Sequence, residues 1–182
     1  MQLIQTVAPL TEPLTLEEVK EFLRVLDNDS DVLISALIVA VREYVENITN
    51  RQLGVATFEL LSEDLFSALP KGSLKTVDKI EILDETLTYV EFNASKYYTY
   101  ISNGIGYISF SEVPTIQDHK QSVKVTFSCG YDVVPEAIKA YMKVKISTLF
   151  ENREQFVIGA SISDFGGDFI DNLLSPYRIR NI

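Results

Sequence analysis

The sequence contains few of the residues on which most enzyme and metal sites depend. Its 182 residues include one cysteine, Cys129, one histidine, His119, and no tryptophan. A disulfide needs two cysteines and a zinc site about four nitrogen or sulfur ligands, so one chain supplies neither. Cys129 lies in an alternating apolar run and is predicted to be buried, whereas His119 lies in a charged stretch that predicts a solvated loop. We therefore expect no catalytic residues, no cofactor and no metal, with a carboxylate pair as the one conceivable catalytic alternative.

The sequence also lacks a long apolar run and a surplus of positive charge. Its longest nearly apolar stretch, residues 32–41, is shorter than the roughly 20 residues that span a bilayer, and no basic residue precedes the first apolar residues as in a secretory signal. We expect a soluble protein of a reducing cytoplasm with no membrane partner. Lys and Arg number 16 against 26 Asp and Glu, a net charge of −10, which argues against a basic face that wraps nucleic acid.

Two helices are predicted within residues 1–53. Thr15 and Glu18 form a capping-box pattern, and apolar residues follow at helical spacing as far as Leu26. A second helix, over about residues 31–50, is apolar around more than half of its circumference. Its polar stripe contains Ser35, Arg42, Glu43, Glu46 and Asn47. Such a helix packs either in the centre of a monomer or against both its own domain and a neighbouring subunit.

The acidic stretch between these helices has part of a calcium-loop pattern. Asp27, Asp29 and Asp31 alternate as in an EF-hand loop, but Val32 and Ile38 stand where that loop needs a glycine and a bidentate glutamate. We therefore favour a structural role, in which the carboxylates lie near the positive end of the second helix.

Residues 54–133 have a period of two and many β-branched and aromatic side chains, which predicts an antiparallel β insertion. Ser102-Asn103-Gly104 predicts a hairpin turn, and Pro70-Lys71-Gly72-Ser73 predicts a second turn. The strands are predicted at 55–61, 74–83, 96–101, 107–110 and 123–129.

The helical period returns over residues 134–153, where Pro135 begins a third helix. Lys145 lies among Ile138, Tyr141 and Leu149 on its apolar side. We expect the Lys145 stem to cover apolar surface with its charge in solvent, and a salt bridge to another subunit is the alternative.

Residues 154–182 are predicted to form a loop, a short apolar helix and a tail that Pro176 keeps from continuing as a helix. The tail alternates apolar and basic residues, which is typical of an extended segment that adds itself to a partner. The predicted fold is therefore α+β: a small helical bundle with an antiparallel β insertion between the second and third helices, and an extended C-terminal tail.

Three passages resemble the head-tail connector (head-completion adaptor) family of tailed bacteriophages and prophages. They are Leu14-Thr15-Leu16-Glu17-Glu18-Val19-Lys20 with residues 33–51, the passage from Val134 to Glu154, and Leu173-Leu174-Ser175-Pro176-Tyr177-Arg178. The resemblance implies a structural protein of the virion neck, assembled in the host bacterial cytoplasm. It also implies a dodecameric ring. This ring would lie under the portal protein, extend the DNA channel and join the capsid to the next neck or tail protein. Lys145 departs from the family pattern, in which an apolar residue is expected.

The resemblance also implies where the interaction sites lie. Docking on the portal would use Leu173, Leu174, Pro176, Tyr177, Arg178, Ile179 and Arg180. The ring interface would use Leu33, Leu37, Val41, Tyr44, Tyr141, Lys145 and Leu149. Alternative functions are a stopper or tail-completion neck protein, or an unrelated protein-binding module.

Charge along the chain agrees with DNA that passes through the lumen without specific binding. Residues 1–60 carry four basic and ten acidic side chains, residues 61–134 six and ten, and residues 135–182 six and six. An acidic lumen would repel DNA phosphates, whereas a basic one would hold them by releasing counterions. The alternative is that the acidity only keeps the protein soluble.

Overall fold

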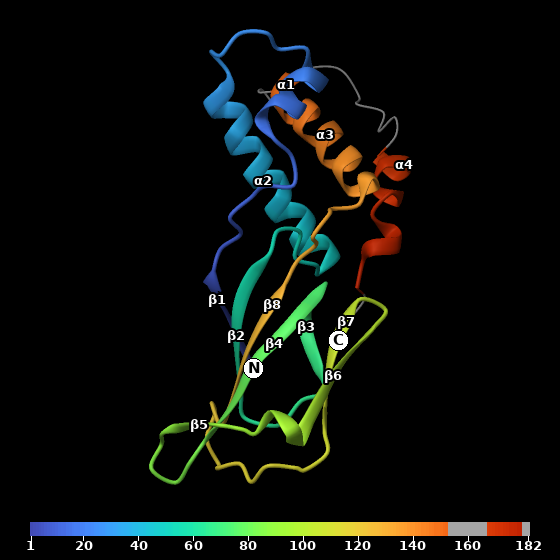
Figure 1. Cartoon of the computed structure of the whole chain (residues 1–182). Helices are drawn as coiled ribbons and strands as arrows, with labels where there is room; N and C mark the ends of the chain where they lie inside the picture. The colour runs from blue at the N-terminus through green and yellow to red at the C-terminus, as the bar shows by residue number, and fades with distance from the viewer. Residues whose placement is uncertain (153–166, 180–182) are drawn as a thin grey trace, which may run out of the picture. The chain divides into compact units, whose positions relative to one another are not determined.

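The computed structural model describes residues 1–152 and 167–179. It combines helices with antiparallel sheets, which confirms the predicted α+β fold class (Figure 1). The chain divides into two compact units. The helical unit contains residues 12–49, 133–152 and 167–178, and the β unit contains residues 1–11 and 50–132 together with Ile179. The loop predicted from residue 154 to the short helix lies outside the described residues, as does Arg180.

The helical unit is built from helices that begin close to their predicted start signals. It contains α1 (Leu16–Leu23), α2 (Asp31–Thr49), α3 (Glu136–Glu151), α4 (Gly167–Asn172) and the 3₁₀-helix η2 (Ser175–Tyr177). The capping box of α1 is confirmed, because Glu18 N donates to Thr15 Oγ1 over 3.1 Å and Thr15 N donates to Glu18 Oε2 over 2.8 Å. The core of the unit contains Val19, Ile34, Ile38, Val41, Val45, Ile138, Tyr141, Met142, Ile146 and Leu174.

The acidic stretch between α1 and α2 is held by a lysine. Lys20 Nζ donates to Asn28 Oδ1 over 2.7 Å and lies 2.6 Å from Asp31 Oδ1. Across the described ranges, no three His, Cys, Asp or Glu side chains come together in a way that could hold a metal ion. The stretch therefore connects the start of α2 to α1.

The β unit contains two antiparallel sheets (Figure 1). In the five-stranded sheet the order is β1 (Gln2–Val7), β2 (Ala56–Ser62), β8 (Val123–Cys129), β4 (Leu74–Leu83) and β5 (Tyr89–Glu91). In the three-stranded sheet the order is β3 (Ala68–Gly72), β7 (Ile105–Phe110) and β6 (Tyr97–Ser102), and the 3₁₀-helix η1 (Ala94–Lys96) precedes β6.

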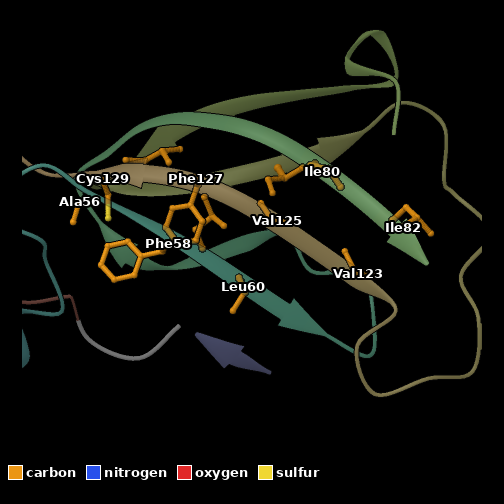
Figure 2. Close-up of a cluster of buried hydrophobic side chains, with 12 residues drawn as sticks. Ala56, Phe58, Leu60, Ile80, Ile82, Val123, Val125, Phe127 and Cys129 are labelled. Atoms are coloured by element: carbon orange, nitrogen blue, oxygen red, sulfur yellow. The ribbon is translucent and has the colours of Figure 1, made fainter. Parts of the chain in front are cut away.

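The core of the β unit lies over the central strands of the larger sheet (Figure 2). Alternate residues of β2 and β8 are buried, as the period of two predicts, and Phe58 lies opposite Phe127 with ring centroids 5.8 Å apart. Cys129 is fully buried at the end of β8, which confirms the prediction of a small core residue. Leu69 and Ile108 of the smaller sheet belong to the same cluster, so the two sheets share one core.

The structure tests the predicted turns and adds strands that were not predicted. The hairpin at Asn103-Gly104 is confirmed, with φ of 52° and 76°, the left-handed pair that a tight turn between strands needs. The turn predicted over residues 70–73 is wrong, because residues 70–72 belong to β3 and the chain turns at Ser73, where φ is 66°. Strands β1, β3 and β5 were not predicted. β3 contains Pro70 and Gly72 and β5 is only three residues long, so pairing with a neighbouring strand decides their conformation.

Truncating Phe127 tests the shared core. The ring is fully buried and stacks on Phe58, so Phe127→Ala should lower the free energy of unfolding by about 3–5 kcal/mol. Urea unfolding followed by circular dichroism measures this loss. Val113→Ala, at a side chain that is 72% exposed, is the control and should change stability by less than about 0.5 kcal/mol. Equal losses for the two variants would contradict the assignment of the core.

Candidate functional site

Helix α2 turns charged side chains toward the interior of the helical unit. Arg42 and Glu46, one helical turn apart, are only 8% and 6% exposed. Arg42 Nη1 donates to Glu46 Oε2 over 2.8 Å, and Arg42 Nε donates to Glu12 Oε2 over 2.8 Å. Burial works to lower the pKa of Arg42, but attraction to Glu46 and Glu12 outweighs it and raises this pKa. The guanidinium is therefore a permanently charged, paired group inside the unit.

The side of α2 that faces away from Ile34, Ile38 and Val45 is largely apolar and exposed, and Arg42 and Glu46 lie along one border of it. At 100° per residue, its exposed positions fall on one half of the helix, and we call their apolar members the α2 outer face. This face contains Val32, Leu33, Ala36, Val39, Ala40 and Tyr44. Val32 is 85% exposed and Tyr44 49%, and the exposed polar residues among them are Ser35, Glu43 and Asn47. An exposed apolar stripe of this kind is typical of a surface that another molecule covers.

Two of the predicted ring residues of α3, Tyr141 and Lys145, lie near Asp171 of α4. Tyr141 is fully buried, and burial together with nearby Tyr44 and Asp171 raises its pKa, so its hydroxyl stays protonated. Lys145 Nζ lies 3.7 Å from Asp171 Oδ1 and 5.5 Å from the centre of the Tyr141 ring. The structure thus gives Lys145 a partner within its own chain, an arrangement that neither alternative from the sequence included. Leu149, one turn further on, is 44% exposed.

The C-terminal segment alternates anchored and exposed side chains. Leu174 is fully buried and Ile179 is 7% exposed, whereas Pro176 and Arg178 are exposed. Leu173 and Tyr177 are half-buried. A short 3₁₀ turn at Ser175–Tyr177 replaces the fully extended segment that we predicted, because Pro176 fits the first turn of a helix.

Ile179 is held within the β unit. Asn50 Nδ2 donates to Ile179 O over 3.3 Å. A Cβ atom on Gly72 would collide with the Ile179 side chain, so this glycine leaves the space that the isoleucine fills. The last described residue is therefore packed against residues from two other segments of the β unit.

The predicted ring residues divide by exposure. Val41 and Tyr141 are buried in their own helical unit, Leu37 and Lys145 are half-buried, and Leu33, Tyr44 and Leu149 are exposed. Tyr44 and Asp171 both lie near Tyr141, and Lys145 lies near Asp171.

Two features of the site were missed from the sequence. Arg42 and Glu46 were placed in the polar stripe of α2, and their burial was not predicted. The spacing of four residues is typical of an ion pair along a helix, and it was the available signal. Val32 and Val39 were not among the predicted interface residues, although they are exposed on the α2 outer face.

The comparisons with known proteins agree with a structural role. No helix within residues 1–152 or 167–179 is both long and apolar enough to cross a membrane. A comparison with curated proteins found no match. The family model of the phage gp6-like head-tail connector protein matches residues 13–128. The chain belongs to this family. Membership confirms the resemblance seen in the sequence and identifies the protein as a structural head-tail connector.

Solved structures share the fold of this connector over its whole length. One is a chain in the neck of an empty gene transfer agent particle computed with C6 symmetry, with a TM-score of 0.81 and 18% identity. Another is in the virion of the native gene transfer agent particle, with a TM-score of 0.81 and 19% identity. A third is in the neck of the native particle computed with C12 symmetry, with a TM-score of 0.70 and 20% identity. Each match covers 100% of the connector and 97% of the other chain.

Removing the charge of Arg42 tests the buried network. Arg42→Met leaves Glu46 buried without its guanidinium partner, so it should lower the free energy of unfolding by about 3–5 kcal/mol. The double variant Arg42→Met/Glu46→Met removes both charges and should recover most of this loss, because Glu12 can return to solvent. Urea unfolding measures both changes, with Glu21→Met on α1 as the exposed control. A double variant less stable than Arg42→Met would contradict the explanation.

Proposed function

We propose that the connector forms a ring in the neck of a phage-like particle, where it joins the head to the tail. Its family and its fold support this proposal, because chains of the same fold occur in particle necks with C6 and C12 symmetry. A twelvefold ring also contains sixfold symmetry, so twelve copies agree with both. The observation that carries the proposal is the α2 outer face, since a monomer leaves this apolar surface in contact with water.

The α2 outer face provides the proposed ring contact. Leu33 and Tyr44 of the predicted interface lie on it, and Val32 and Val39 extend it. Leu149 adds an exposed apolar side chain on α3, whereas Val41 and Tyr141 support these residues from the interior. Copies arranged head to tail bury such a face against a different surface of the next copy and close into a ring.

A charge on the α2 outer face should weaken assembly. Val39→Asp places a carboxylate in the proposed contact, where its desolvation is unfavourable, and should raise the concentration needed for half-assembly at least about tenfold. Mass photometry and electron microscopy, with and without the portal protein, measure the rings. Val113→Asp, on an exposed loop of the β unit, is the matched control and should assemble normally. Normal rings from Val39→Asp would exclude this face from the interface.

The C-terminal segment is the proposed docking site for the portal protein. Leu174 and Ile179 anchor it to the connector itself, and this leaves Pro176 and Arg178, with Leu173 and Tyr177 partly, to contact the portal. Arg180 belongs to the same proposal but lies outside the described residues. Deleting residues 173–182 would remove two buried side chains, so a single substitution tests docking better than truncation does.

Reversing the charge of Arg178 should weaken portal binding without affecting the fold. Arg178 is exposed, so Arg178→Glu should leave the melting temperature unchanged and raise the Kd for the portal at least about tenfold. Biolayer interferometry on immobilised portal measures the Kd. Arg24→Glu, at an exposed arginine after α1, controls for net charge. Equal affinities for both variants would move the docking site elsewhere.

The remaining parts of the proposal concern DNA, the next neck protein and assembly. The surplus of acidic side chains in residues 1–134 supports a lumen through which genomic DNA passes without being held. We further propose that the connector has no enzymatic activity, that it is assembled in the host bacterial cytoplasm, and that it presents a platform to a downstream neck or tail-completion protein.

A further inference from the structure

The β unit has four strand edges, two in each sheet. β1 and β5 end the five-stranded sheet, and β3 and β6 end the three-stranded sheet. An edge strand presents unpaired backbone N–H and C=O groups, with which a strand of another chain can pair. Natural sheets block such pairing with short strands, charged residues or proline. The four edges can therefore be compared by strand length, charged residues and proline.

Two edges, β3 and β5, have at least one of these protective features. β3 contains Pro70, which has no backbone N–H, and Lys71, whose charge must stay in water. β5 is only three residues long and contains Glu91, which is exposed. Neither strand suits the addition of a further strand.

The other two edges, β1 and β6, are not short and contain neither a charged residue nor a proline. β1 and β6 are six residues long each, and neither contains a charged residue or a proline. The first charged side chain of the protein is that of Glu12, well beyond the end of β1. Within the described parts of the chain, no strand pairs with the outer side of β1 or of β6. β6 is open to pairing along its whole length, and β1 is open from Gln2 to Gln5, beyond which its register with β2 shifts.

The side chains of β6 form a rigid, exposed surface beside its open edge. Tyr100 stacks on Tyr107 of β7 with ring centroids 5.1 Å apart, and Tyr98 lies 6.1 Å from Tyr100. Tyr98 is 59% exposed and Ile101 57%. On β1, Ile4 and Val7 are exposed. Aromatic residues beside β-branched residues are favourable pairs between neighbouring strands, so the side chains of β1 suit a position next to β6.

The two open edges lie on opposite sides of the β unit, β1 beside β2 and β6 beyond β7 (Figure 1). A contact between edge β1 of one copy and edge β6 of the next is head to tail, so each copy keeps one open edge for a further neighbour. Contacts of this kind produce rings or filaments rather than closed dimers.

We propose that β1 of one copy pairs with β6 of the next copy, so that the sheets of neighbouring subunits are joined by backbone hydrogen bonds. This inference rests on the proposed ring and names a second contact within it. The occupant of each edge is another copy of the same chain. Strand addition supplies affinity through the backbone, and the tyrosines of β6 supply specificity.

Crosslinking between introduced cysteines tests this pairing. Ile4→Cys marks the middle of β1 and Thr99→Cys the middle of β6, while native Cys129 is buried and unreactive. On rings assembled with the portal, a short bismaleimide should join a mixture of the two single variants into dimers only. The double variant Ile4→Cys/Thr99→Cys should give a ladder of multimers. Dimers from either single variant alone would show like-with-like edges and overturn the proposal.

Charge placed on each edge gives an independent test. Gln5→Lys on β1 and Thr99→Lys on β6 introduce the charge that these edges lack, and each should raise the concentration for half-assembly about tenfold. Val90→Lys on β5, an edge that the proposal leaves unpaired, is the matched control and should assemble as the unaltered chain does. Circular dichroism shows that each variant is folded.

The outcomes separate this inference from the proposed function. Rings that form without crosslinks between β1 and β6, or that tolerate Gln5→Lys, overturn the edge pairing and leave the ring in place. An unaltered chain that forms no ring with the portal overturns the proposed function, and the edge pairing with it.

Discussion

The burial of Arg42 is the constraint on which the architecture of the helical unit depends. A guanidinium inside a protein is tolerated only when carboxylates pair with it, and here Glu46 supplies one from the next turn and Glu12 another from the segment before α1. The pair with Glu12 and the buried apolar residues of α2 together fix the rotation of this helix about its axis. If α2 turned by half a revolution, Val32 and Val39 would enter the interior, but Val41 and Val45 would leave it, and Arg42 would lose Glu12. The interior of the unit thus specifies one orientation, and the apolar outer face is its consequence.

This orientation makes the isolated chain an incomplete structure in physical terms. Its charged residues occupy part of the interior, while Val32, Leu33 and Tyr44 meet solvent. Exposed apolar surface favours assembly, because the free energy of covering it is released only when copies meet. The apolar exterior therefore favours association. The surplus of acidic side chains acts against indiscriminate association, since net charge keeps protein copies apart in solution.

Local signals in the sequence predicted most elements but not their pairing. The capping box at Thr15, the hairpin at Asn103-Gly104 and the alternation of β8 are encoded within a few residues, so they could be found directly. β3 contains Pro70 and Gly72, which indicate a turn, and only its pairing with β7 makes it a strand. The inward side of α2 was equally hidden, because periodicity gives the angle between residues and not which side meets the core. Charges that find partners 30 residues away, as Arg42 does with Glu12, cannot be paired from spacing alone.

The two proposed contacts of the ring differ in how strictly they fix the orientation of neighbouring copies. The α2 outer face is apolar and tolerates small shifts, because the hydrophobic effect has no direction. Strand pairing is directional, and a slip by one residue turns every side chain to the opposite face of the sheet. A ring that uses both obtains affinity from one and angular precision from the other. Each copy in a closed ring also has two neighbours, so two contacts that are weak individually act together to keep it in the ring. The protected edges of β3 and β5 confine strand addition to β1 and β6, the edges that continue the ring.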